Sequence, residues 1–453
     1  MNIVIAGAGI MGKAIAGRLC RNGHDISIIE KDSVELNMAL NAMDVTGICG
    51  NCVSPEILED AGCAHAEVFI AATGSDETNL ISCVLAKKTG AEHTIALLRD
   101  PDFRPGTNLW RDTLGISLVI QPDYVTAEEI SRVLQFPAAT RVEVFTEGEP
   151  ELVTFRIPEN SPICNIPLRV LRKNIRQDIL ICCIDRSGEY NIPDGNDIIL
   201  PGDQVTVTGA PLTLRRFFIS AGLYKKPVSN VILLGGSRIS VYLQELLETT
   251  GTNVKIIERD SERAVYLSER LRKADIICAD GANVSVLQEN GLNNADAFVS
   301  LTGSDENNII LGMYAQKSGV KKVITKVKND RFAELLQDVF PDSSLSPLHL
   351  VTQRVEAYIQ GLSYASDKST IESMYYLGDG NTTATEYIAG TGSSILGKPL
   401  SELKFKEDVL LASVIRGGKS ILPGGQTVLA PGDRAVVITR NAGIKDLDGL
   451  LEV

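Results

Sequence analysis

The chain opens with MNIVIAGAGIMG (residues 1–12), in which an apolar run leads directly into closely spaced glycines. The apolar run predicts a buried strand, and the residues after the glycines predict a helix. Gly7, Gly9 and Gly12 have the spacing GxGxxG at this turn. The first glycine permits the tight turn, the second lets the backbone approach a pyrophosphate, and the third lets helix and strand pack closely. The stretch therefore predicts a dinucleotide-binding βαβ unit.

An acidic residue follows at the distance that such a unit requires. Glu30 lies in the next apolar run, ISIIEKD (26–32), 23 positions after Gly7. A carboxylate in this place accepts hydrogen bonds from the adenosine ribose hydroxyls and repels a 2′-phosphate, which favours NAD over NADP. It does not distinguish NAD from ATP or ADP, because all three carry the same ribose. The alternative interpretation of Glu30 is a solvated strand end.

The same pattern recurs in the second half of the chain. VILLGGSRIS (231–240) matches the opening stretch, and VKIIERD (254–260) matches the acidic stretch, with Glu258 in the place of Glu30. TGSDENN (302–308) matches TGSDETN (73–79) after a single-residue insertion. The sequence is therefore a tandem duplication.

A shorter unit also repeats. PDGNDIILPGDQVTV (193–207) matches PGGQTVLAPGDRAVV (423–437), and each predicts a strand, a Pro-Gly-Asp turn and another strand. The order of units predicts an α/β protein with tandem duplicated Rossmann-like doubly wound parallel-sheet domains, each followed by a small α+β domain. The expected domains are 1–138, 139–226, 227–368 and 369–453.

Within the first unit, apolar runs bounded by glycine alternate with amphipathic segments, as in a parallel sheet covered on both faces. Strands are expected at 2–6, 25–30, 46–49, 68–72, 94–98 and 118–120. Helices are expected at 13–22, after Ser33, after Ser54, at 76–89 and, as a crossover element, at 123–136.

Composition narrows the functional class. The 453 residues include 44 basic and 57 acidic side chains, a net charge of −13. This charge argues against nucleic-acid binding and against adhesion to anionic lipid through basic clusters. No apolar run reaches the roughly 18 residues of a transmembrane helix, and the N-terminus does not resemble a signal peptide. Nine scattered cysteines fit reduced thiols in a cytoplasm.

The candidate binding residues lie where strands meet the following loops, at the carboxyl edge of the sheet. Thr73 and Gly74 are expected to lie against the bound nucleotide, and Asn51 is expected to lie near its adenine. Ser75 or Asp76 is expected to cap the next helix. Arg99 either reaches a phosphate or a neighbouring subunit, or forms a surface ion pair. The full set comprises Gly7, Ala8, Gly9, Ile10, Met11, Glu30, Asn51, Thr73, Gly74, Arg99, Gly235, Gly236, Ser237, Arg238, Ile239, Glu258, Thr302 and Gly303.

The second glycine loop is altered. Ser237 and Ser240 replace the second and third glycines, and a serine side chain crowds both the pyrophosphate approach and the helix packing. Arg238 could compensate through a phosphate contact. Three outcomes stay open for this site: another phosphate-rich ligand, weak binding, or a purely structural role.

Other patterns in the sequence do not predict chemistry. Cys49 and Cys52 form one CxxC pair that the second copy does not repeat, so a metal or redox site is not expected. Tyr364 and Lys368 have the spacing of a reductase pair but lie in an expected linker. The four histidines show no pairing with an acid that indicates a general base. No catalytic and no metal-binding residue is predicted.

The tandem order, the loop IVIAGAGIMG, Glu30, TGSDETN and the Pro-Gly-Asp turns together resemble the TrkA family of Trk system potassium uptake proteins. The longer unit resembles an RCK N-terminal domain, and the shorter unit resembles a TrkA C-terminal domain. The second glycine loop, with Ser237 and Ser240, departs from the family pattern.

The resemblance implies a regulatory protein rather than an enzyme. It implies a homo-oligomeric ring, with a tetramer expected, held on the cytoplasmic face of the membrane by a potassium-translocating, TrkH/TrkG-like subunit. NAD(H), ATP or ADP is the implied regulatory ligand. A ligand shifts such a ring only through its different affinity for two states. The alternatives are an NAD-dependent dehydrogenase, and an RCK regulator of a different channel or exchanger.

Overall fold

The computed structural model describes the chain in two compact units. The first unit comprises residues 1–131 and 228–356, and the second comprises 132–227 and 357–453. The residues not described are 102, 104–112, 137, 146–150, 176–177, 224–227, 329–331, 333–343, 364–368, 378–381, 418, 441–443, 445 and 453.

The first unit contains two parallel sheets with the same strand order. In the first sheet the order is β3-β2-β1-β4-β5-β6, so the chain reverses direction across the sheet next to β1. The strands are β1 (Asn2–Ala6), β2 (Asp25–Glu30), β3 (Thr46–Cys49), β4 (Val68–Ala71), β5 (His93–Leu97) and β6 (Leu118–Ile120). Ligands bind at the carboxyl edge of such sheets, beside this reversal.

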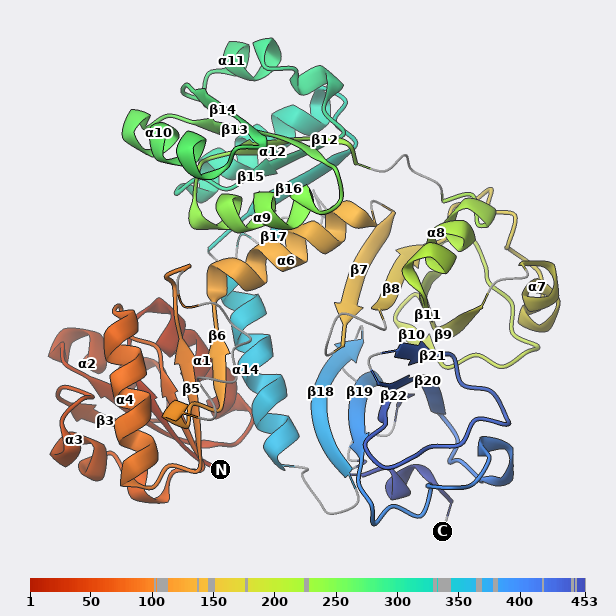
Figure 1. Cartoon of the computed structure of the whole chain (residues 1–453), viewed down its shortest axis with the longest axis horizontal. Helices are drawn as coiled ribbons and strands as arrows, with labels where there is room; N and C mark the ends of the chain where they lie inside the picture. The colour runs from red at the N-terminus through yellow and green to blue at the C-terminus, as the bar shows by residue number, and fades with distance from the viewer. Residues whose placement is uncertain are drawn as a thin grey trace. The chain divides into compact units, whose positions relative to one another are not determined.

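Helices cover the faces of this sheet (Figure 1). They are α1 (Ile10–Arg21), α2 (Ser33–Ala42), α3 (Pro55–Asp60) and α4 (Asp76–Thr89). The crossover helix α6 (Pro122–Gln135) follows β6 and lies beside the second half of the unit instead. α1 begins three residues earlier than expected, directly after Gly9. Two side chains start helices: Asp32 accepts hydrogen bonds from the second and third residues of α2, and Ser75 accepts one from Thr78 in α4.

The second sheet repeats this plan, with the order β14-β13-β12-β15-β16-β17. Its strands are β12 (Asn230–Leu234), β13 (Asn253–Glu258), β14 (Ala274–Cys278), β15 (Ala297–Ser300), β16 (Lys322–Lys326) and β17 (Ser344–Leu345). Its helices are α9 (Arg238–Glu248), α10 (Ser261–Arg270), α11 (Val284–Glu289), α12 (Asp305–Lys317) and α14 (Pro347–Ser363). The central strands of both sheets are almost wholly buried and apolar, as expected for parallel sheets.

The second unit contains two antiparallel five-stranded sheets, in the orders β10-β9-β11-β8-β7 and β18-β19-β22-β20-β21. The first consists of β7 (Ala139–Val144), β8 (Glu151–Arg156), β9 (Ile179–Arg186), β10 (Glu189–Asn191) and β11 (Gln204–Gly209), with helices α7 (Leu168–Ile175) and α8 (Pro211–Ser220). The second consists of β18 (Ser369–Leu377), β19 (Thr382–Ala389), β20 (Val409–Arg416), β21 (Lys419–Ile421) and β22 (Arg434–Thr439). The predicted fold class is confirmed; the four domain boundaries stay predictions.

One expectation about the shorter unit is wrong in both copies. The residues before the Pro-Gly-Asp turn form no strand there, only single bridges at Ile198 and Val428. The aspartate of the turn holds this segment instead. The Asp203 carboxylate accepts a hydrogen bond from the backbone N–H of Leu200 at 2.8 Å. It also forms an ion pair with Arg186 at 2.8 Å. Side-chain hydrogen bonds of this kind compete with strand pairing.

Among the described residues, none of the helices combines the length and the apolar character that crossing a lipid bilayer demands.

Candidate nucleotide-binding sites

The first glycine loop is as tight as its sequence predicts. Gly7 has φ +104°, a left-handed conformation, and a Cβ at this residue would lie 2.8 Å from the carbonyl oxygen of Ala72. A Cβ on Gly12 would lie 1.9 Å from the carbonyl oxygen of Gly7. Space over Gly9 is open, since its Cβ would meet no described atom within 4 Å. The loop thus leaves room for a ligand at its second glycine and none at the other two.

Glu30 faces this loop. Its carboxylate accepts hydrogen bonds from the backbone N–H of Ala8 at 2.7 Å and of Asp32 at 3.1 Å. The second copy repeats the arrangement: Glu258 accepts from Gly236 at 2.6 Å and from Asp260 at 2.8 Å. Each carboxylate oxygen can accept further hydrogen bonds, so both glutamates are oriented by the loop and still able to bind ribose hydroxyls.

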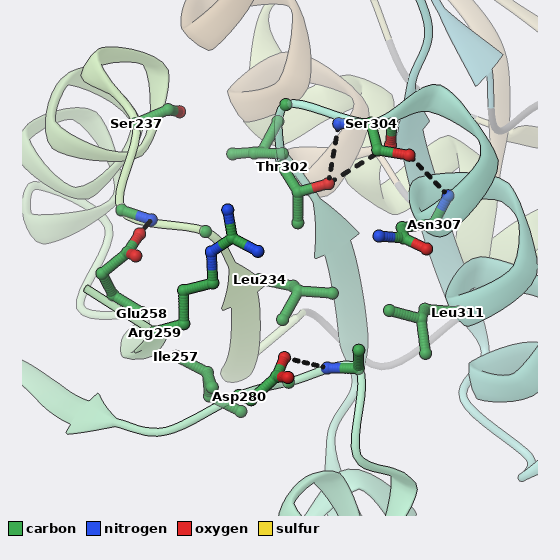
Figure 2. Close-up of a pocket in the computed structure, with 16 residues that line it drawn as sticks. Leu234, Ser237, Ile257, Glu258, Arg259, Asp280, Thr302, Ser304, Asn307 and Leu311 are labelled. Carbon is green, nitrogen blue, oxygen red and sulfur yellow. Dashed lines mark hydrogen bonds between the residues drawn. The ribbon is translucent and has the colours of Figure 1, made fainter.

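A cavity of about 620 Å³ lies at the carboxyl edge of the second sheet. Glu258 and Arg259 form one wall, and Thr302, Ser304 and Asn307 lie across from them (Figure 2). The lining includes the predicted residues Gly235, Gly236, Ser237, Glu258, Thr302 and Gly303. The altered second loop therefore still borders a cavity of the size that small ligands occupy.

The two serines of the second loop form hydrogen bonds with backbone groups of the same loop. Ser237 precedes α9, and its hydroxyl accepts a hydrogen bond from the backbone N–H of Ser240. The Ser240 hydroxyl donates to the carbonyl oxygen of Gly235 at 2.6 Å. Gly12 in the first loop has no room for such a side chain. Serine is accommodated in the second loop because the backbone there leaves room for its Cβ, and its hydroxyl then reaches the carbonyl oxygen of Gly235.

Arg238 and Ile239 do not line the cavity. The Arg238 guanidinium forms an ion pair with Asp123 of α6, at 2.8 Å, and Ile239 is buried. Tyr124, beside Asp123, meets Tyr242 of α9 edge to face. The second-site helix is therefore attached to the crossover helix of the first half. A phosphate contact through Arg238 stays a prediction, which this geometry does not favour.

The threonines of the two TGSD motifs are held by asparagines on the following helices. Thr73 donates its hydroxyl to Asn79 at 2.6 Å, and Thr302 does the same to Asn308 at 2.7 Å. Ser75 caps α4, which confirms the expected capping role. Asp76 does not cap the helix, since it accepts hydrogen bonds from the backbone N–H groups of residues 99 and 100.

The remaining first-site candidates lie around the same edge. Ile10 is 74% exposed at the start of α1, beside Met11. Gly74 has open space above it. Arg99 is exposed and follows β5. In the second copy its counterpart Lys328 donates its Nζ to the carbonyl oxygen of Gly303 at 3.0 Å.

Sequence reasoning missed Arg259 and Asp280. Arg259 extends toward the cavity in Figure 2, and within the described part of the chain no ion pair or hydrogen bond engages its guanidinium. A signal was present, because both copies carry a basic residue directly after the candidate ribose-binding acid (Lys31 and Arg259). Asp280 aligns with Asn51, a predicted candidate, and could have been found from the repeat.

The CxxC pair shows no functional geometry. Cys49 is exposed, Cys52 is buried, and both are free thiols. Burial raises the pKa of the Cys52 thiol above its usual value, which disfavours the reactive thiolate. The described residues contain no group of three or more side chains arranged to hold a metal ion. Tyr364 and Lys368 lie outside the described residues.

Replacing Ser237 by glycine is expected to tighten nucleotide binding at the second site several-fold, because it frees the backbone N–H of Ser240 for a phosphate oxygen. Loss of this cap should cost only a few tenths of a kcal/mol of stability. Calorimetric titration of the variant and the wild-type chain with ADP tests this. Unchanged affinity with unchanged stability would show that the loop does not contact the phosphates.

Comparison with known domain families matches both repeated units. The TrkA-N domain matches residues 3–122 and 231–347, and the TrkA-C domain matches residues 152–218 and 384–451. A Trk system potassium uptake protein TrkA homolog of Archaeoglobus fulgidus is 30% identical over 446 residues, which is 97% of both chains. Trk system potassium uptake protein TrkA of Vibrio alginolyticus is 27% identical, over 100% of this chain and 99% of its own.

Solved structures show the same fold. The GsuK channel bound to NAD aligns with a TM-score of 0.64 at 15% identity, covering 97% of this chain and 76% of that one. The GsuK RCK domain aligns with a TM-score of 0.63 at 15% identity, covering 96% of this chain and 92% of that one.

Proposed function

The chain belongs to the TrkA family of Trk system potassium uptake proteins, and from this premise we propose that it is the nucleotide-binding regulatory subunit of a potassium uptake system. It controls transport through a conformational change that depends on bound nucleotide. The cavity bordered by Glu258 and the second glycine loop carries this proposal, since it unites a ribose-binding acid with a phosphate-binding turn.

An adenine nucleotide, NAD(H), ATP or ADP, is the proposed ligand of both sites. The residues present fit such a group. Glu30 and Glu258 accept from the ribose hydroxyls, and the open space over Gly9 admits the phosphates to the N-terminus of α1. Arg259 supplies a positive charge at the second site. The GsuK channel, which shares this fold, has been solved with NAD and with ADP.

Transmission of binding requires that the ligand favour one of two conformations. The contacts of α9 support a route for the second site. Its loop begins α9, and α9 is attached to α6 through the Arg238–Asp123 ion pair and the Tyr124–Tyr242 contact. A ligand that moves the loop therefore acts on an element of the first half of the chain.

The proposed partner is a membrane-embedded, potassium-translocating subunit of the TrkH/TrkG type. The names of the curated relatives support this assignment, because they describe parts of a Trk potassium uptake system. The chain is proposed to act in the cytoplasm as a homo-oligomeric ring, expected to be a tetramer, bound to the inner face of the membrane through that partner.

We propose no enzymatic role. The relatives that match over the full chain are named as parts of a Trk potassium uptake system, which supports a regulatory role. Regulation of a different channel or exchanger is the remaining alternative, and the full-length match to Trk system proteins favours the potassium uptake system.

Potassium flux into liposomes that contain a TrkH-type subunit tests the function. The flux should change when this chain is added, and should change again on addition of NADH or ATP. A chain carrying both Glu30→Ala and Glu258→Ala serves as the control, and should bind the membrane subunit without responding to nucleotide. Flux that is indifferent to this chain at every nucleotide concentration contradicts the proposal.

A further inference from the structure

We propose that Gln121 couples the two nucleotide sites within one chain. It is a positioning residue, which joins the loops of the first site to the crossover helix α6 and, through α6, to the loop of the second site. A nucleotide bound at one site thereby changes the affinity of the other. This inference rests on the proposed function, since it concerns communication between the two proposed sites.

A buried amide makes the first connection, between the loop after β4 and the end of β5. Asn79 of α4 is 1% exposed, and its Oδ1 accepts hydrogen bonds from the backbone N–H of Thr73 at 2.9 Å and from the Thr73 hydroxyl at 2.6 Å. Its Nδ2 donates to the carbonyl oxygen of Leu97, the last residue of β5, at 2.7 Å. The candidate binding loop at Thr73 is therefore tied to the end of the neighbouring strand.

The segment after β5 is held from two sides. From α4, the Asp76 carboxylate accepts hydrogen bonds from the backbone N–H groups of Arg99 at 2.8 Å and of Asp100 at 2.7 Å. From the other side, Gln121 donates its Nε2 to the carbonyl oxygens of Asp100 at 2.8 Å and of Phe103 at 2.7 Å. Asp100 thus connects α4, which follows the first-site loop, to Gln121.

Gln121 stands directly before α6 and begins its first turn. Its backbone carbonyl accepts a hydrogen bond from the N–H of Val125 at 2.9 Å. Two residues further along the chain, Asp123 forms its ion pair with Arg238, the first residue of α9, so that α6 and α9 lie side by side (Figure 1). Because the second glycine loop leads into α9, a series of contacts connects the Thr73 loop to the second site.

One of the two polar atoms of the Gln121 side chain is not satisfied. The residue is 1% exposed, and its Oε1 has no hydrogen-bond partner among the described residues. A buried acceptor without a partner lowers stability, and a methionine would fill a similar volume without this cost. Stability alone therefore does not account for a glutamine here. The amide adds the two Nε2 donors, which hold two carbonyl oxygens at once.

The second copy has different residues at both ends of this connection. Ser346 takes the place of Gln121 before α14, and its hydroxyl accepts a hydrogen bond from the backbone N–H of His349 at 3.3 Å. A hydroxyl has a single donor, so it cannot hold two carbonyl oxygens as the amide does. Leu348 takes the place of Asp123 and carries no charge for an ion pair. The coupling therefore runs through α6 rather than through α14.

Calorimetric titration of the full-length chain with ADP measures the coupling. Glu30→Ala leaves the second site and Glu258→Ala leaves the first, so each variant gives one single-site association constant. The product of the two constants of the wild-type chain, divided by the product of the single-site constants, is the coupling factor. This factor should differ from one by at least fivefold. Gln121→Met, introduced into all three chains, should bring it to within twofold of one, with single-site affinities within twofold of their previous values.

Gln360→Met makes the same change on α14 and is the matched control, which should keep the wild-type coupling factor. Asp123→Leu cuts the connection at its other end with the residue of the second copy, and should also abolish coupling. It serves as the test should Gln121→Met fail to fold, which thermal unfolding of the variant reveals.

A coupling factor within twofold of one in the wild-type chain, or one that persists in either folded variant, overturns this inference and leaves the proposed function standing. Absence of ADP binding to the wild-type chain overturns the proposed function itself, and this inference with it.

Discussion

Removal of the proposed ribose-binding acid is expected to weaken ADP binding about 100-fold at the site affected, for Glu30→Ala at the first site and Glu258→Ala at the second. A hydrogen bond to a charged group contributes about 1.5–3 kcal/mol, so a 100-fold loss, about 2.7 kcal/mol, corresponds to one strong bond or two weak bonds from the ribose hydroxyls. The substitution also removes the acceptor of the loop N–H at Ala8 or Gly236. The loss of affinity should therefore exceed that of a ribose contact alone.

Calorimetry with each single variant, and with the double variant, measures this effect. Glu59→Ala is a suitable control, because Glu59 lies exposed on α3 and contacts neither loop. The double variant should show no measurable binding while its thermal unfolding profile stays close to that of the wild-type chain. Affinity within twofold of wild type in both single variants would place the nucleotide elsewhere.

Gly12→Ser is expected to destabilise the first domain by about 3 kcal/mol and to abolish its nucleotide site. The new Cβ would lie 1.9 Å from the carbonyl oxygen of Gly7, so α1 must move away from the loop. The same residue type is accommodated in the second copy, where Ser240 donates to Gly235. The experiment thus asks whether the first loop can adopt the backbone geometry that accommodates Ser240 in the second.

Denaturant unfolding of the full-length chain, followed by far-UV circular dichroism, measures the loss of stability. Gly9→Ala is the matched control: its Cβ meets no described atom within 4 Å, so stability should stay within about 0.5 kcal/mol of wild type while affinity falls. A Gly12→Ser chain as stable as wild type, with ADP affinity intact, would show that the first loop can relax as the second does.

The sequence predicts the fold well because the duplication places each motif in the chain twice, so that each copy supports the interpretation of the other. The expected strand end at Glu30 agrees with the structure to the residue, and Glu258 ends the equivalent strand of the second copy. The expected strands before the Pro-Gly-Asp turns were wrong because Asp203 and its counterpart Asp433 take over the hydrogen bonding of the segment. The pattern of apolar residues before each Pro-Gly-Asp turn is visible in the sequence. The side chain that forms hydrogen bonds with the backbone of that segment is not.

The site was predicted less completely than the fold. Gly235, Glu258 and Thr302 border the second cavity, whereas Arg238 forms an ion pair with Asp123. Nucleotide binding by these residues stays a prediction. That ion pair joins residues 115 positions apart, a separation that local spacing does not reveal. Arg259 and Asp280 could have been found by aligning the two copies, because they are equivalent to Lys31 and to the candidate Asn51.

Titration of the purified full-length chain with NADH, NAD, ATP and ADP, followed by recovery of the nucleotide, tests the central claim most directly. The account predicts saturable binding of at least one of these nucleotides, with a stoichiometry of up to two per chain, a change in the hydrodynamic profile on binding, and nucleotide recovered chemically unchanged. Failure of all four to bind, or recovery of a reduced, oxidised or hydrolysed product, would contradict it.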